Sequence, residues 1–209
     1  PPCSATAVTI HEPATFLTDC VLAALAATLA WRLRVAGPAA GWWRRAFVLI
    51  AVSAIVGGTY HGFAPHAPEA ARSLWWFATL ATISGVSACL LLSLIHEMAP
   101  VGRIPLWRGI VTAKLIVALL VAAARPEFIV AIADYGLALG AWLLASLRVA
   151  RPWRGWMLAG IGLSAAAAVV QQSDWPRLTH FNHNDLYHLI QALGLIAFFQ
   201  VARRLGMSN

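Results

Sequence analysis

Three histidines stand at the ends of long apolar stretches of this chain. The segment His183–His188, with the sequence His-Asn-Asp-Leu-Tyr-His, opens the last stretch, and His61 closes the second. Ionisable side chains are costly inside a bilayer and usually mark functional sites or pairs there. A catalytic zinc site uses three protein ligands and leaves a fourth position for water. We therefore expect a zinc site whose ligands are His61, His183 and His188.

Two carboxylates are candidates for supporting roles at this metal. Asp185 lies between the two later histidines and is expected to be a further ligand or the partner of one. Asp19 lies within the first apolar stretch, where an unpaired carboxylate costs about 2.5–3.5 kcal/mol. It needs a partner, and a histidine N–H suits it because a carboxylate behind a metal-bound imidazole fixes the ring tautomer. We expect Asp19 to orient a ligand or to accept the proton of zinc-bound water.

The spacing of the last two histidines restricts how they can share an ion. Residues five apart on a regular helix diverge by about 140°. We therefore expect His183 to lie in a non-helical lead-in, although a local bulge or a role for Asn184 or Asp185 are alternatives. The run from Asn182 to Asp185 also resembles a helix start, where asparagine caps exposed amides. Capping and interfacial packing are thus the rival explanation of these polar residues.

Composition places the chain among membrane proteins. Its 209 residues are 60% apolar and 11% charged, whereas a soluble domain carries about twice that share of charge. A spanning helix needs about 20 apolar residues, and prolines fall between consecutive stretches of this kind. We predict an all-α polytopic membrane protein in which residues 1–209 form a single seven-helix domain. The expected spans are residues 14–32, 46–64, 74–95, 105–125, 127–149, 154–172 and 185–203.

Charge asymmetry predicts the orientation. Eleven arginines flank one set of alternating junctions and three flank the other. The positive-inside rule then puts the amino terminus outside and the carboxyl terminus in the cytoplasm, with the bacterial cytoplasmic membrane as the expected location. The net charge of +7 is explained by this asymmetry, so we expect no nucleic-acid partner. The candidate metal site falls at the non-cytoplasmic face.

Two opposite charges fall near mid-membrane on neighbouring stretches. Lys114 lies in the fourth stretch and Asp134 in the fifth. A mutual ion pair or shared polar network is the simplest explanation, because an isolated charge at this depth is costly. A proton or ion pathway is the functional alternative.

The topology and histidine placement resemble the CREST superfamily of membrane hydrolases, which includes alkaline ceramidases and adiponectin-type receptors. The resemblance implies that His61 is the ligand from the second helix and that His183 and His188 are the pair from the seventh. The family pattern also has a serine four residues before the first histidine, an aspartate in the third helix and His-x-x-x-His in the seventh. Here Gly57 replaces that serine, the third stretch lacks aspartate, and four residues separate the later histidines.

These observations predict a zinc-dependent integral membrane hydrolase of an amide or ester bond in a lipid, with membrane lipid as its partner and substrate. Two alternatives remain open. The abundance of alanine and glycine favours close helix packing and suits a non-catalytic subunit that binds another membrane protein. Histidines on two facing helices also suit axial haem ligation or ion handling.

Overall fold

The apolar stretches form helices because a chain in lipid must satisfy its backbone polar groups internally. The computed structural model describes residues 9–179 and 181–205. Two 3₁₀ turns, η1 (Ala64–His66) and η2 (Val101–Arg103), and a hairpin of β1 (Arg177–Leu178) and β2 (Phe181–Asn182) connect some of the helices. The α-helices are α1 (Pro13–Arg32), α2 (Pro38–Phe63), α3 (Glu69–Met98), α4 (Ile104–Ala124), α5 (Phe128–Arg148), α6 (Arg154–Ser173) and α7 (His183–Ala202).

The helices have the length and composition of membrane spans. Six of the seven described α-helices, all except α6, are long and apolar enough to cross a bilayer. The prediction of a polytopic all-α membrane protein is therefore confirmed at this level. Helix α2 begins at Pro38 rather than near residue 46, because proline is well suited to the first turn of a helix. Helix α3 extends beyond residues 74–95 at both ends and stops just before Pro100.

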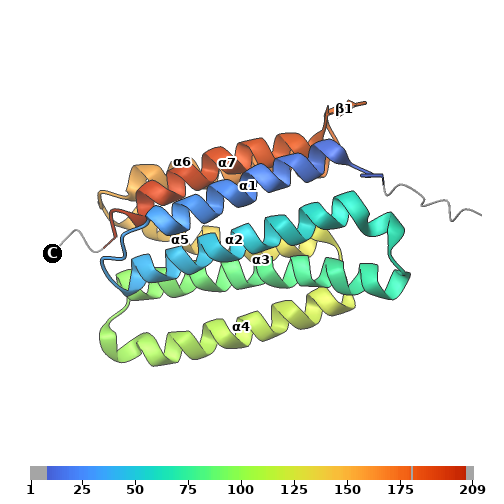
Figure 1. The fold of residues 1–209 in the computed structure, drawn as a ribbon. Helices are drawn as coiled ribbons and strands as arrows, with labels where there is room; N and C mark the ends of the chain where they lie inside the picture. Colours follow the sequence, from blue (N-terminus) through green and yellow to red (C-terminus); the bar gives the residue numbers. More distant parts are fainter. Residues whose placement is uncertain (1–8, 180, 206–209) are drawn as a thin grey trace, which may run out of the picture.

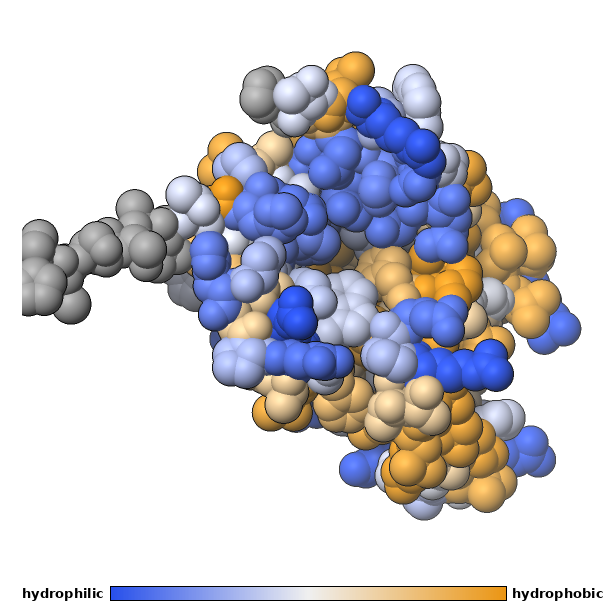
Figure 2. All heavy atoms as spheres, turned by 90° about the vertical axis from the view of Figure 1, so that its right-hand side faces the viewer, coloured by the Kyte–Doolittle hydropathy of each residue, from blue (hydrophilic) through white to orange (hydrophobic). Residues whose placement is uncertain are grey.

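The bundle has two ends, and seven chain segments meet at the one that carries the hairpin. We call it the hairpin end; it contains the starts of α1, α3, α5 and α7 and the ends of α2, α4 and α6 (Figure 1). Helix α1 packs between α2 and α7, α6 lies along α7, and α4 lies at the edge of the bundle against α3. Viewed onto the hairpin end, hydrophilic side chains gather above, and the end of α4 at the bottom is hydrophobic (Figure 2).

The half of the bundle away from the hairpin end is filled by aromatic side chains. Trp43 contacts Phe198 at a centroid separation of 5.3 Å, and Trp142 contacts Trp153 at the same separation. All four rings are buried. The indole N–H of Trp142 donates to the Leu90 carbonyl at 3.0 Å, so this buried donor is satisfied. This half is a packed core, which leaves the hairpin half to accommodate a site.

A polar network attaches the peripheral helix α4 to the bundle, as predicted for Lys114 and Asp134. The Lys114 ammonium lies 2.5 Å from an Asp134 carboxylate oxygen and donates to the Ser87 hydroxyl at 2.6 Å. Ser87 in turn donates to the Asp134 backbone carbonyl at 2.8 Å. Because α4 buries few side chains and lipid provides little hydrophobic drive for helix association, we assign this network a structural role.

A glycine permits a close approach of α1 to α2, and its substitution tests the packing. A Cβ atom added at Gly58 would lie 2.6 Å from the Cβ of Asp19. We predict that Gly58→Ala lowers the stability of the detergent-solubilised protein by about 1–3 kcal/mol, the usual cost of overpacking. The matched control is Gly109→Ala in α4, where an added Cβ meets nothing within 4 Å. Thermal unfolding that is equally affected by both substitutions would contradict this packing.

Candidate functional site

The segment before α1 is held against the end of α2, and this places a carboxylate beside His61. The His11 amide donates to the Gly62 carbonyl at 3.0 Å, and His66 Nε2 donates to the Thr9 carbonyl at 2.8 Å. Glu12 follows directly, and its Oε2 lies 3.0 Å from His61 Nδ1. The hydrogen bond leaves Nε2 as the second nitrogen of the ring, so Glu12 fixes the orientation of His61.

The start of α7 is built by a capping box. The Asn182 side chain accepts from the amides of Asn184 and Asp185, and the Asp185 side chain accepts from the Asn182 amide at 2.7 Å. This satisfies amides that a helix start leaves without partners. The predicted helix cap is confirmed, and the fully buried Asp185 is engaged in it.

A second imidazole–carboxylate pair joins α7 to α1. His188 lies one turn beyond the cap, with Nε2 3.2 Å from Asp19 Oδ1 and Nδ1 3.0 Å from the Thr18 hydroxyl. Asp19 is 4% exposed and His188 is 8% exposed. The expectation that Asp19 pairs with a histidine is therefore confirmed. The contact places an ionisable imidazole and a carboxylate next to each other inside the bundle.

A third, looser pair lies nearer the surface. His183 Nδ1 is 3.5 Å from Asp174 Oδ1, and Asp174 also binds Arg177 at 2.6 Å. Asp174 ends α6 in the left-handed conformation, with φ at 58°. An aspartate tolerates this conformation better than most residues. Because Asp174 and Arg177 are exposed, we expect this pair to contribute little to stability.

All three histidines border one cavity in the hairpin half of the bundle. Its volume is about 580 Å³, within the range of ligand sites in proteins. Every α-helix except α4 contributes to its wall. The polar part lies at the hairpin end, whereas isoleucines and leucines line the part that extends toward the aromatic core. The apolar lining includes Leu22, Ile50, Ile83, Ile132, Leu139, Leu143, Ile161 and Leu195.

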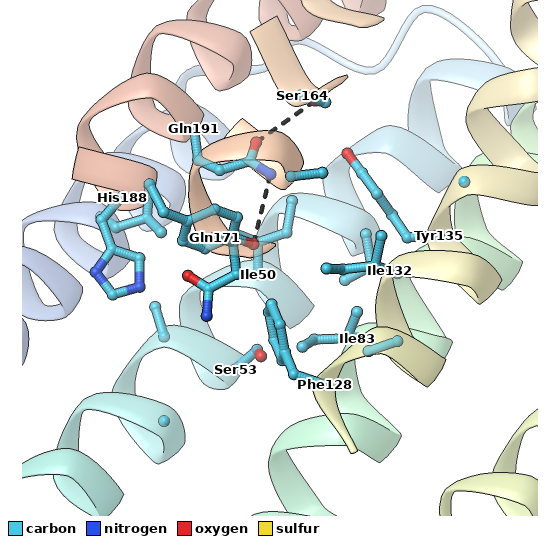
Figure 3. Close-up of a pocket in the computed structure, with 18 of the residues that line it drawn as sticks. Ile50, Ser53, Ile83, Phe128, Ile132, Tyr135, Ser164, Gln171, His188 and Gln191 are labelled. Atoms are coloured by element: carbon cyan, nitrogen blue, oxygen red, sulfur yellow. Dashed lines mark hydrogen bonds between the residues drawn. The ribbon is translucent and has the colours of Figure 1, made fainter. Parts of the chain in front are cut away.

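Amide and hydroxyl groups continue the polar lining from the histidines into the cavity (Figure 3). Gln191 Oε1 accepts from Ser164 and its Nε2 donates to Tyr187, both at 3.5 Å. The side chain of Gln171 projects from α6 on the same side as His188, across from Tyr135. Gln171 Oε1 is buried without a hydrogen-bond partner among the described residues. The lining of the cavity therefore changes from titratable side chains, through neutral polar side chains, to apolar side chains.

The structure does not assemble the predicted zinc ligands into one set. Within residues 9–179 and 181–205, no group of three or more His, Cys, Asp or Glu side chains is placed to hold a metal ion. Asp185 serves the helix cap, and both nitrogens of His188 have protein partners. The expectation that His183 precedes the helix is wrong, because it is the first residue of α7. It therefore diverges from His188 by about 140°.

Glu12 is a functional candidate that the sequence does not connect to His61. It directly precedes Pro13, a combination typical of an ordinary helix start, and no spacing connects it to His61. The hydrogen bond from His61 lowers the pKa of Glu12 from its ordinary value near 4.5, and this outweighs the opposing effect of partial burial. Glu12 therefore remains ionised at neutral pH and can stabilise a positive charge on His61.

The lowered pKa of Glu12 predicts a pH-dependent contribution to stability. A depressed carboxylate pKa stabilises the fold above the ordinary value near 4.5, and this contribution is lost as pH falls through the lowered pKa. Glu12→Gln should therefore lower the melting temperature at neutral pH but have a much smaller effect in strong acid. Glu127→Gln, at an exposed glutamate of the same end, is the control. A Glu12→Gln effect that does not change with pH would contradict the pairing.

Comparison with known proteins gives a family but no function. Neither the curated proteins nor the solved structures contain a match to this chain. The family of unknown function DUF6962 matches residues 14–207. That range includes all seven described α-helices except the first residue of α1. The chain therefore belongs to the family of unknown function DUF6962.

Proposed function

We propose that this protein is a membrane enzyme that hydrolyses an amide or ester bond of a lipid bound in the cavity. The observation that carries the proposal is the position of two imidazole–carboxylate pairs, Glu12–His61 and Asp19–His188, at the polar end of a cavity that is otherwise apolar. An acyl chain fits the isoleucine and leucine lining, and the acyl linkage then lies beside groups that exchange protons. Amphipathic cavities of this volume commonly bind small molecules.

We also propose the membrane orientation that the distribution of arginines predicts, with the hairpin end outside. Helix α5 ends away from the hairpin and α7 begins at the hairpin, so α6 must traverse the bundle between them. This supports a seventh span although α6 is less apolar than the others. The arginine asymmetry then places the hairpin end outside the bacterial cytoplasmic membrane. The cavity would open near the outer headgroups, where a lipid linkage meets water.

His61 is the proposed general base. Its Nδ1 is held by Glu12, so Nε2 accepts a proton from water as the water oxygen attacks the acyl carbon. The bond from that carbon to the leaving oxygen or nitrogen then breaks, and the leaving group receives a proton from His61 or from the Asp19–His188 pair. General acid–base catalysis of this kind contributes about 10²–10⁴-fold to rate. The products are a carboxylic acid and an alcohol or amine.

The described side chains do not form a zinc site for this reaction. The donors predicted for it, His61, His183, His188 and Asp185, are engaged with separate partners in the described part of the chain. A zinc site needs several ligands converging on one point about 2.0–2.1 Å from each imidazole nitrogen. The observed arrangement supports proton transfer by the paired side chains instead.

Loss of the proposed base tests the function. We predict that His61→Gln lowers the hydrolysis rate by about 100-fold or more in a panel of fluorogenic lipid esters and N-acyl amides presented in detergent. His66→Gln is the matched control, because His66 lies at the same end but is exposed and bonded to the Thr9 carbonyl. Failure of the wild-type protein to hydrolyse any of these lipids, or full activity of His61→Gln, would refute the proposal.

Metal dependence provides a separate prediction. Protein purified without added metal should contain far less than one equivalent of zinc, and its hydrolytic rate should persist in chelator. The reason is that the side chains needed for a ligand set bind one another. Elemental analysis of wild type and His188→Ala measures this directly. One tightly held equivalent that His188→Ala releases would show that the paired side chains rearrange around a metal.

A further inference from the structure

A smaller polar pocket adjoins the main cavity at the hairpin end. Its volume is about 190 Å³, and it is bordered by the end of α2, the turn η1, the start of α3 and the segment before α1. His61 lines both spaces and so borders each of them. Arg72, His11, Glu12 and Tyr60 supply most of the remaining polar wall.

Arg72 gives this pocket its chemical character. It lies in the first turns of α3 and is partly buried, and its Nε has no hydrogen-bond partner among the described residues. A buried donor without a partner is costly, and a bound anion is one group that would satisfy it. Glu12 does not serve this purpose, because its carboxylate is paired with His61. The arginine is therefore available for an anion.

We infer that this pocket binds the phosphate of an anionic lipid headgroup while the acyl chain of the same lipid occupies the main cavity. The planar fork of an arginine matches two phosphate oxygens, and His11 adds a further donor at the rim. Glu12 is paired with His61, and the guanidinium of Arg72 is the permanently charged cation in the wall of this pocket.

The position of His61 connects this pocket to catalysis, and this step rests on the proposed function. In a phospholipid, the ester or amide bond lies a few covalent bonds from the phosphate. A headgroup bound at Arg72 and an acyl chain in the main cavity would therefore place that linkage next to His61, which borders both spaces. The inferred substrate class is a phosphate-bearing acyl lipid.

Binding without turnover tests the inference. Isothermal titration in detergent compares dihexyl-ether phosphatidate, neutral dihexyl-ether glycerol and inorganic phosphate on the protein, because ether linkages are not hydrolysed. We expect the ether phosphatidate to bind at least about tenfold more tightly than the neutral ether lipid, which corresponds to one charge-assisted hydrogen-bonded contact. Arg72→Gln should remove this preference and Arg72→Lys should retain part of it. Arg125→Gln, at an exposed arginine of the same end, should leave it intact.

The outcomes separate this inference from the proposed function. Equal binding of the two lipids by wild type, or a preference that survives Arg72→Gln, would overturn the headgroup site. Inorganic phosphate that binds as tightly as phosphatidate would also overturn it, because the pocket would then be a site for free phosphate. A preference that depends on Arg72 in a protein that hydrolyses no lipid would support the headgroup site and refute the hydrolase. Hydrolysis that is unaffected by headgroup charge or by Arg72→Gln would support the hydrolase and refute the headgroup site.

Discussion

Ionisable side chains enclosed by apolar helices require partners, because neither lipid nor a packed core replaces their hydration. In this bundle, the partners come from different helices. Asp19 and His188 join α1 to α7, and Lys114 and Asp134 join α4 to α5. Glu12 joins the segment before α1 to His61 at the end of α2. These contacts therefore also join neighbouring segments of the bundle and fix where the imidazole–carboxylate pairs lie.

The two halves of the bundle differ in how they are filled. The aromatic half is filled by buried rings such as Trp43, Trp142 and Phe198, which pack against one another. The hairpin half contains the cavity and the imidazole–carboxylate pairs. A rigid core beneath an amphipathic cavity is the arrangement that would hold a flexible lipid with its polar linkage at a fixed depth.

The sequence predicted the elements better than the contacts between side chains. Apolar length and proline positions gave the helices, and the cost of a buried carboxylate correctly required a histidine partner for Asp19. The convergence of His61, His183 and His188 on one cavity also follows from topology. The hydrogen-bond partners of these histidines do not follow from topology, because they depend on the rotation of each helix about its axis and on side-chain rotamers. Glu12 illustrates this, since only the folded N-terminal segment brings it to His61.

The occupancy of the cavity by a lipid is the claim on which the function depends, and photocrosslinking tests it most directly. A phospholipid with a diazirine in the middle of one acyl chain would be reconstituted with the protein in nanodiscs, and the labelled residues mapped by mass spectrometry. Labelling of the cavity residues Leu143 and Leu195, in competition with unlabelled phospholipid, is the predicted result. Labelling confined to outward-facing residues such as Leu120 and Leu137 would contradict it.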